Sequence, residues 1–293
     1  MDLNLLENTA LQLIEQAAII IPEDVKAALK NAYVREHDAL GKEQLKIILE
    51  NIELAEKEHV PVCQDTGTVI FYVRAGAQAG NLHGVLQALM EATRKATRLV
   101  PLRPNAVHPF TGRNSGDNTG KLVPCIHWEI MPGKRLELTV MLKGGGSENV
   151  SAVRMLLPSE GLNAVKKFVV DSVVSAGATP CPPTLIGVAV GGGADVAMEL
   201  AKKTLLRPVG SVNPDPEAAK LEKELLKAVN MTEVGPMGLG GKTTALSVHV
   251  DYAHRHPASY PAAVAFSCWA CRRASASIDE NGHVEPTVYG GKK

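Results

Sequence analysis

The sequence lacks three features that would point to nucleic acids or membranes: an excess of charge, aromatic residues and long apolar runs. Its 31 basic and 31 acidic side chains cancel, which removes the long-range field that binders of nucleic acid or anionic membranes use. Aromatic residues make up only 4% of the chain, so platforms for stacking bases are not expected. No apolar stretch approaches the roughly 20 residues that a membrane-spanning helix needs. We therefore expect no nucleic-acid partner and no membrane association.

The sequence also lacks the marks of a secreted protein. Its first residues, MDLNLLENTALQLIEQ, carry early acidic side chains and no basic segment, which is not typical of a signal peptide. Small secreted domains have dense, even sets of cysteines, whereas this chain has five that are thinly spread. They are Cys63, Cys125, Cys181, Cys268 and Cys271. We expect a cytoplasmic protein whose cysteines are core thiols, nucleophiles or metal ligands.

What the chain does contain is enough apolar material, 45% of its residues, for a substantial core. Apolar residues recur at helical spacing over the first 60 residues, and after Pro61 helical and strand-like segments alternate. Asp215-Pro216-Glu217 predicts the start of a helix, with a capping aspartate followed by proline. This order of helices and strands predicts an α/β fold, in which a helical N-terminal layer packs on a mixed β-sheet body flanked by helices. We expect residues 1–60 to form that layer, 61–280 to form the α/β body as one structural unit and 281–293 to form a tail.

Two local expectations concern the strands. Residues 126–130 (IHWEI) and 136–142 (LELTVML) alternate in polarity and are joined by Pro132–Gly133, so they predict a β-hairpin. The polar segment 275–287 (SASIDENGHVEPT) predicts irregular structure. A long polar stretch at 101–124, which contains GRNSGDNTG, is of a length that is usually functional or disordered.

Two glycine-rich loops raise the alternative of nucleotide binding. The stretch GPMGLGGKTT resembles a phosphate-binding P-loop, but the position six residues before Lys242 is Pro236, where that motif requires glycine. The residues that follow, ALSVHVDY, alternate like a strand, whereas a P-loop leads into a helix. The second loop, GGGAD, lacks the G-x-G-x-x-G spacing of a dinucleotide site and favours a tight turn. The spacing therefore disfavours nucleotide binding.

The cysteines and histidines give weak local signals for a metal. His249, His254 and His256 lie close in sequence, but no acidic or histidine cluster accompanies them, so a single active-site histidine is favoured over a zinc site. Cys268 and Cys271 form a C-x-x-C pair, which leaves a redox protein as an alternative.

Three other contexts place a cysteine at the end of an element: PVCQDTG, PCPP and AFSCWACRR. Their separations exceed 80 residues, too wide for a local motif, but three such thiols could still converge on one site. Three cysteines on a four-iron cluster would leave one iron open to act as a Lewis acid.

At these motifs the chain resembles the alpha subunit of class I, iron–sulfur-dependent fumarate hydratases and L-tartrate dehydratases. The matching stretches run in family order from about residue 60 to 275 and cover most of the chain. They include PVCQDTGTVIFYV, PLRPNAVHP, NSGDNTG, KGGGSENVSAVRMLLPSEG, AGATPCPPTLIGVAVGGGAD, GPMGLGGKTTALSVHV and CWACRRA. The resemblance implies a [4Fe–4S] cluster held by Cys63, Cys181 and Cys268, whose fourth iron binds the substrate hydroxyl and carboxylate.

The resemblance also implies roles around the cluster. Asp65 matches the active-site aspartate that handles the hydroxyl end of the proton transfer, and Gln64 lies in the same pocket. Arg103 matches an arginine that binds a substrate carboxylate, for which a guanidinium fork is suited. Gly146 offers a backbone contact to substrate, and His256 aligns with a family histidine.

Two departures from the family pattern affect the expectations. The run after the third ligand is Trp269-Ala-Cys-Arg-Arg, where the family often has His-Ala-Ala-Arg-His, so Cys271 is interpreted as a neighbour of the cluster. Cys125 matches no ligand position and is interpreted as a core thiol. Single-chain members carry a second domain that is not found here, so we expect a separate beta subunit, a higher hetero-oligomer and no activity of this chain alone. The motifs favour fumarate and malate as the dicarboxylate pair, with L-tartrate as the alternative.

Overall fold

The structure is a computed structural model that describes residues 2–289. It divides the chain into two compact units, each made of separate stretches. The first unit comprises Met1–Pro22, Ile52–Gly144 and Arg272–Lys293, and the second comprises Glu23–Asn51 and Gly145–Cys271. The boundary near residue 51 falls inside α3 (Ala39–Glu58). Helices and mixed sheets occur in both units, which confirms the predicted α/β class. Residues 290–293 of the expected tail lie outside the described residues.

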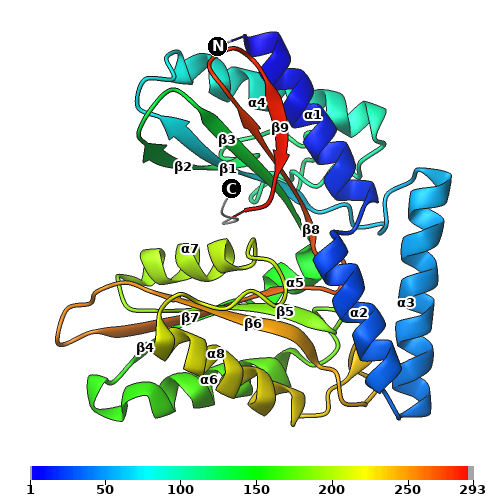
Figure 1. The fold of residues 1–293 in the computed structure, drawn as a ribbon, viewed down its shortest axis with the longest axis vertical. Helices are drawn as coiled ribbons and strands as arrows, with labels where there is room; N and C mark the ends of the chain where they lie inside the picture. Colours follow the sequence, from blue (N-terminus) through cyan, green and yellow to red (C-terminus); the bar gives the residue numbers. More distant parts are fainter. Residues whose placement is uncertain (1, 290–293) are drawn as a thin grey trace. The chain divides into compact units, whose positions relative to one another are not determined.

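The first unit is a mixed sheet in the order β2–β1–β3–β8–β9, with two helices on one face (Figure 1). Its elements are α1 (Leu3–Ile19), β1 (Thr68–Gly76), α4 (Leu82–Leu99), β2 (Cys125–Met131), β3 (Leu136–Lys143), β8 (Arg272–Ile278) and β9 (Val284–Thr287). β1 is parallel to β2 and antiparallel to β3, and the remaining pairs are antiparallel. β1 therefore has neighbours on both sides.

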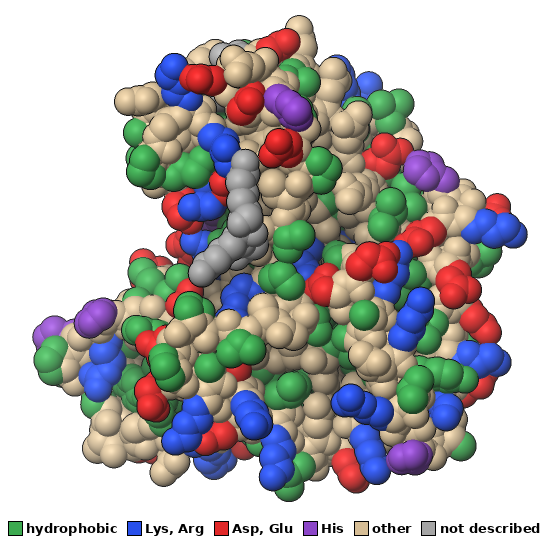
Figure 2. Space-filling view, viewed as in Figure 1, with side chains coloured by type: hydrophobic (Ala, Val, Ile, Leu, Met, Phe, Trp, Pro, Cys, Tyr) green, Lys and Arg blue, Asp and Glu red, His purple; other side chains and the backbone are tan. Residues whose placement is uncertain are grey.

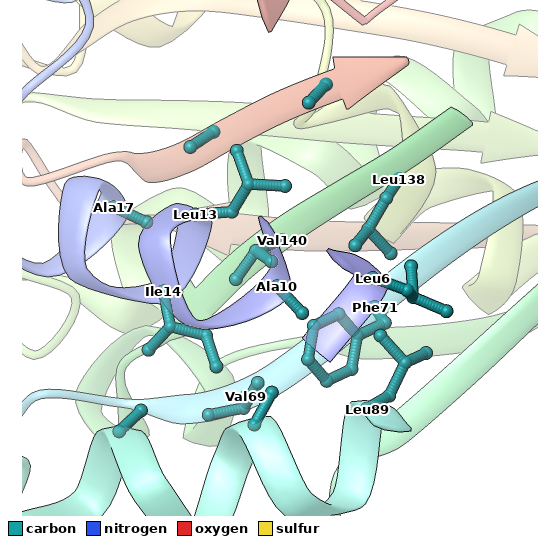
Figure 3. Packing of buried hydrophobic residues seen from close by; sticks show 14 of the residues in the cluster. Leu6, Ala10, Leu13, Ile14, Ala17, Val69, Phe71, Leu89, Leu138 and Val140 are labelled. Atoms are coloured by element: carbon teal, nitrogen blue, oxygen red, sulfur yellow. The ribbon is translucent and has the colours of Figure 1, made fainter. Parts of the chain in front are cut away.

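The core of this unit lies between the sheet and helices α1 and α4 (Figure 3). Leu6, Ala10, Ile14 and Ala17 of α1 are all 0% exposed, which confirms the apolar stripe that their spacing predicts. Figure 3 shows this stripe against the sheet, where Phe71 of β1 is also fully buried. The packing fixes β1, and with it the segment just before β1.

The expected hairpin between residues 126–130 and 136–142 is wrong. β2 and β3 are consecutive strands, but β1 lies between them and pairs with both. Their connection crosses the end of β1, where the Gly76 N–H donates to the carbonyl oxygen of Arg135 at 2.8 Å. A Cβ at Gly76 would overlap the carbonyl group of Gly133, so the crossing needs glycine there. Alternation predicts the faces of each strand, but it does not name the neighbour with which the strand pairs.

The polar C-terminal segment forms strands rather than irregular structure. Most of it lies in β8 and β9, and β8 is an internal strand of the sheet. Ala274, Ala276 and Ile278 of β8 face the core and are at most 6% exposed. Serine and alanine dominate β8, so it has little of the β-branched and aromatic content that indicates a strand in a sequence.

The second unit is a mixed sheet in the order β4–β7–β5–β6, with helices on both faces (Figure 1). Its elements are α2 (Glu23–Arg35), α5 (Gly145–Asn149), β4 (Ala152–Leu156), η1 (Pro158–Glu160), α6 (Gly161–Ala176), β5 (Thr184–Val190), α7 (Ala194–Thr204), α8 (Pro216–Asn230), η2 (Pro236–Gly238), β6 (Ala245–Tyr252) and β7 (Tyr260–Ser267). β5 is parallel to β6, whereas the pairs β4–β7 and β5–β7 are antiparallel.

The two faces of this sheet are covered by different helices. Ile186 and Val188 of β5 join the core cluster that includes α6 and α8. Gly187 between them faces α7, since a Cβ there would overlap the carbonyl oxygen of Ala201. α8 begins as predicted, because the Asp215 carboxylate accepts hydrogen bonds from two backbone N–H groups at 2.9 and 3.2 Å. Burial on both faces explains the nearly continuous apolar character of β5 and β7.

Acidic and basic side chains are interspersed over the face that Figure 2 shows, in keeping with the balanced composition. Among the described residues, no helix combines the length and the apolar character that crossing a membrane requires.

Candidate functional site

The segment that carries Cys63, Gln64 and Asp65 forms a bend between α3 and β1 in the first unit. One carboxylate oxygen of Asp65, Oδ1, accepts a hydrogen bond from the backbone N–H of Gly67 at 3.0 Å, which closes the bend. Gly67 has φ +85°, and a Cβ there would lie 2.9 Å from the carbonyl carbon of Leu142. The glycine of QDTG is thus needed so that the chain can enter β1 beside β3. Gln64 is exposed, whereas Cys63 and Asp65 are half-buried.

Arg103 is held through its backbone, and its side chain is exposed. Its N–H donates to the hydroxyl oxygen of Thr66 at 3.0 Å, and its carbonyl oxygen accepts from Nδ2 of Asn118 at 3.1 Å. Thr66 and Asn118 are 3% and 2% exposed, so these bonds are shielded from water. The guanidinium is therefore presented from a fixed backbone position.

Asn105 connects Arg103 to the Asp65 bend. Its amide nitrogen donates to the carbonyl oxygen of Gly67 at 3.0 Å and lies 3.5 Å from Oδ1 of Asp65. Its backbone N–H donates to Oδ1 of Asn118 at 2.6 Å. The motifs QDTG, PLRPN and NSGDNTG thus meet in one hydrogen-bonded network, which brings the predicted site residues Asp65 and Arg103 together.

Arg272 is a member of this network that sequence reasoning missed. It is 2% exposed, and its Nη1 donates to the backbone carbonyl oxygen of Asp65. Its buried Nε has no hydrogen-bond partner among the described residues. The only sequence signal was its place in CWACRRA, four residues after Cys268, in a segment otherwise interpreted through its cysteines.

The neighbouring loop contains both a pocket lined by basic side chains and a half-buried carboxylate. A pocket of about 650 Å³ lies within the polar stretch 101–124, and His108, Arg113 and Lys121 line it without an acidic residue. In the same loop, burial acts to raise the pKa of Asp117. Hydrogen bonds from the hydroxyl and N–H of Thr119, supported by Ser115 and Arg94, outweigh burial and lower the pKa of Asp117 below its ordinary value. The carboxylate therefore stays ionised inside the loop.

In the second unit the structure brings Cys181 and Cys268 together. The backbone N–H of Trp269, the residue after Cys268, donates to the carbonyl oxygen of Cys181 at 3.2 Å. Cys181 has φ +52°, a left-handed conformation that is uncommon outside glycine, and its N–H donates to the carbonyl oxygen of Ala178 at 2.9 Å. Both cysteines are half-buried.

Gly146 lies in α5 of the same unit, close to the chain that leads into Cys181. A Cβ at Gly146 would lie 2.8 Å from the carbonyl oxygen of Thr179. The absence of a side chain thus lets α5 approach the PCPP turn.

His256 is not brought to these residues. It lies in the exposed loop before β7, whereas Cys268 follows the other end of that strand. Eight residues of strand separate the two ends by roughly 26 Å. Nδ1 of His256 accepts a hydrogen bond from the Ala258 N–H at 3.1 Å, which is a contact within the loop of His256.

The donor chemistry of the cysteines fits a metal–sulfur group. None of the five cysteines forms a disulfide, and thiolates are the ligands that iron–sulfur clusters use. Sγ of Cys125 lies 3.4 Å from Nε2 of His127 on β2, and Cys125 is half-buried, whereas Cys271 is 1% exposed. Within the described residues, no three His, Cys, Asp or Glu side chains are gathered as ligands of one ion. Cys63 belongs to the first unit and Cys181 and Cys268 to the second.

The structure does not support the two alternatives that the sequence raised, a redox protein and a nucleotide-binding protein. The C-x-x-C segment connects β7 to β8 and opens no helix, as a thioredoxin-like site would. The loop GPMGLGGKTT leads into strand β6, as predicted, rather than into the helix that a P-loop requires.

Comparison with known proteins covers most of the chain. The family model described as fumarate hydratase (Fumerase) matches residues 7–277. A Methanocaldococcus jannaschii protein, provisionally named an L(+)-tartrate dehydratase subunit alpha, is 44% identical over 273 residues, which cover 92% of this chain and 96% of that protein. The L(+)-tartrate dehydratase alpha subunits of Escherichia coli K12 and Shigella sonnei are each 37% identical over 256 residues, covering 87% of this chain and 84% of theirs.

Proposed function

This chain belongs to the fumarate hydratase (Fumerase) family, and from that membership we propose that it is the alpha subunit of an enzyme that reversibly hydrates fumarate to L-malate. The family and the names of its relatives make it a hydro-lyase subunit. The observation that carries the assignment of the site is the network that joins the Asp65 bend to the backbone of Arg103. The roles of individual residues below are proposals.

We assign two functions to this network. The exposed guanidinium of Arg103 binds one carboxylate of the dicarboxylate, because its planar fork matches a carboxylate in two parallel hydrogen bonds. Asp65 exchanges the proton of the substrate hydroxyl, and its backbone is held at the carbonyl oxygen by Arg272. Gln64 contacts the substrate beside Asp65, and the backbone of Gly146 supplies a further contact.

We propose that Cys63, Cys181 and Cys268 hold a [4Fe–4S] cluster. These three cysteines are half-buried, whereas Cys271 is buried, and this difference in exposure supports them over Cys271 as ligands. When bound by three cysteines, such a cluster supplies an iron with an open position, which is a Lewis acid for a substrate oxygen. We leave His256 out of the site, since it lies at the opposite end of β7 from Cys268.

The reaction adds a proton to one carbon of the double bond and hydroxide to the other. Its reverse requires removal of a weakly acidic carbon-bound proton, a step for which we assign no residue of this chain. We propose that a separate beta subunit supplies that base and further carboxylate-binding residues, because the relatives are named as alpha subunits. The assembly would be a higher hetero-oligomer, and its location in the cytoplasm stays a prediction.

L-tartrate is a second candidate substrate, because the relatives reported above are named as subunits of L(+)-tartrate dehydratases. Malate and tartrate are both four-carbon hydroxy diacids, so Arg103 and Asp65 would act on both in the same way. The choice between them depends on how the pocket receives the second hydroxyl of tartrate.

Anaerobic assays of the purified alpha–beta complex test the proposal. We expect hydration of fumarate, with slower or no dehydration of L-tartrate, and no turnover by this chain alone. A complex that acts on tartrate but not on fumarate or malate would establish the second candidate, and turnover by the chain alone would contradict the need for a beta subunit.

The ligand assignment has its own test. Replacing Cys63, Cys181 or Cys268 by serine should abolish or strongly reduce the brown colour that an iron–sulfur cluster gives to the reconstituted complex. Replacing Cys125 by serine should leave the colour intact, and loss of colour in that control would contradict the assignment.

A further inference from the structure

The glycine loop at residues 235–242, GPMGLGGK, has no part in the function proposed above, yet it is closely packed. A Cβ at Gly235 would overlap the carbonyl oxygen of Gly240, and one at Gly238 would overlap the Cβ of Ala178. The N–H of Gly240 also donates to the carbonyl oxygen of Val234 at 3.0 Å. Such close backbone contact indicates that this loop holds a neighbour in place.

That neighbour is the turn that carries Cys181. The N–H of Met237 donates to the carbonyl oxygen of Pro182 at 2.7 Å, directly after the cysteine. Gly238 packs against Ala178, whose carbonyl oxygen accepts the hydrogen bond of the Cys181 N–H at 2.9 Å. The loop therefore contacts the chain on both sides of Cys181.

Cys181 needs such support because of its backbone. A left-handed conformation is strained for a residue with a side chain, and it persists only where the surroundings impose it. The direction of the Cα–Cβ bond, which carries the thiol group, follows from this conformation. If the turn relaxed to an ordinary backbone conformation, the thiol would point elsewhere.

The other end of the loop is anchored by Glu36, which is 1% exposed and follows α2. One of its carboxylate oxygens, Oε1, accepts hydrogen bonds from the N–H groups of His37 and Asp38 at 3.0 and 3.1 Å. The other, Oε2, accepts from the N–H of Lys242 at 2.8 Å, and a Cβ at Gly241 would lie 2.9 Å from it. A buried carboxylate with three backbone donors is costly to replace, because each donor would lose its partner.

We propose that Glu36 and residues 235–242 form a positioning device for Cys181. Glu36 is a positioning residue: it fixes the end of the loop, the loop holds Ala178 and Pro182, and these set the direction of the Cys181 thiol. The positioning stands on contacts within the second unit. Its importance for a cluster rests on the function proposed above.

The sharpest variant is Glu36→Gln, which keeps the size and shape of the side chain. A carboxamide has a single acceptor oxygen, so it can bond to the His37 and Asp38 N–H groups or to that of Lys242, but not to both. Glu36→Asp is a second variant, which stays charged but is too short by one methylene to reach Lys242. The matched control is Glu23→Gln on α2, where the side chain is 87% exposed.

The measurement is the rate at which iodoacetamide alkylates each cysteine of the metal-free chain, followed by peptide mass spectrometry. In Glu36→Gln and Glu36→Asp we expect the rate at Cys181 to change by about threefold or more, because the turn opens locally. The rates at Cys63 and Cys125 in the first unit should stay as in the unmodified chain, and Glu23→Gln should change none. An unchanged Cys181 in both variants, or equal acceleration of all five cysteines, would overturn the proposal.

Iron retention by the reconstituted alpha–beta complex extends the test. We expect Glu36→Gln to lose iron to a chelator faster than Glu23→Gln, and equal rates would contradict a role of this device in holding a cluster. If the unmodified complex binds no iron, the proposed cofactor fails, while the alkylation rates still decide whether Glu36 positions Cys181.

Discussion

Single residues in the Asp65 network act as much through the space they leave as through the bonds they make. Gly67 lets the chain pass beside β3, and the Asp65 carboxylate closes the bend by accepting a hydrogen bond from the Gly67 N–H. Asn118 serves three partners at once: it accepts from Asn105 and donates to Arg103 and to Thr97. These contacts indicate which substitutions should be felt and how.

Replacing Gly67 by alanine should destabilise the chain by about 1–3 kcal/mol, because the new Cβ meets the backbone of β3 at a positive φ. Gly116→Ala is the matched control, since Gly116 has φ +83° but open space around its Cβ position. Urea unfolding of both variants measures the difference. Equal losses would mean that the backbone conformation alone, not the contact with β3, imposes glycine at position 67.

Replacing Asn118 by alanine should raise KM for the dicarboxylate by about tenfold or more, with a smaller effect on kcat. The reason is that the carbonyl oxygen of Arg103 loses its buried donor, so the guanidinium is no longer presented from a fixed position. Steady-state kinetics of the alpha–beta complex measure the change. Asn281→Ala serves as the control, since Asn281 is exposed and lies between β8 and β9, outside this network. An unchanged KM would remove Asn118 from the support of Arg103.

Among single residues, the sequence indicated those that lie in recognisable motifs. It did not indicate the residues that hold them in place through long-range hydrogen bonds. Asp65 and Arg103 could be predicted from QDTG and PLRPN, and the structure brings them together. Arg272 could not be predicted, because it reaches Asp65 across 207 positions of the chain and no local pattern encodes such a contact. The ligand roles of the three cysteines stay predictions.

Among the elements, helices were easier to predict from the sequence than strand neighbours. The stripe on α1 and the Asp215 cap of α8 are local patterns, and both are confirmed. The pairing of β1 with both β2 and β3 is a long-range choice, made by the burial of β1 and by the glycine at position 76. β8 was not predicted, because its sequence is rich in serine and alanine, which do not indicate a strand. These small residues nevertheless suit a strand that is paired on both sides and buried.

The loop around Asp117 should respond to acid. Its pKa is lowered in the folded chain, so the carboxylate stabilises the fold above its ordinary pKa of 3.8, and this contribution is lost as the pH falls through the lowered pKa. Asp117→Asn should therefore be less stable than the unmodified chain at pH 5 to 7, with a difference that shrinks below about pH 4. Urea titrations over this range measure it. A difference that stays constant down to pH 2 would contradict the hydrogen-bonded carboxylate.

For the whole molecule, the balance of charge has a measurable consequence. The formal net charge is zero at pH 7, so little electrostatic repulsion keeps isolated chains apart near neutrality. We expect self-association of the isolated chain to be strongest near pH 7 and weaker at pH 9, as measured by static light scattering. Attraction that increases steadily with pH would show that a particular surface, rather than net charge, governs association.

The division of the chain into discontinuous units has a consequence for its synthesis. β3 ends at Lys143, but its neighbour β8 ends at Ile278, after the whole of the long stretch of the second unit. At about 5–20 residues per second, the ribosome completes β8 roughly 7 to 27 seconds after β3. During that interval β3 has an unpaired edge, so the nascent chain offers a site for mispairing or for a chaperone. The part of the protein that is made first is therefore the last to be completed.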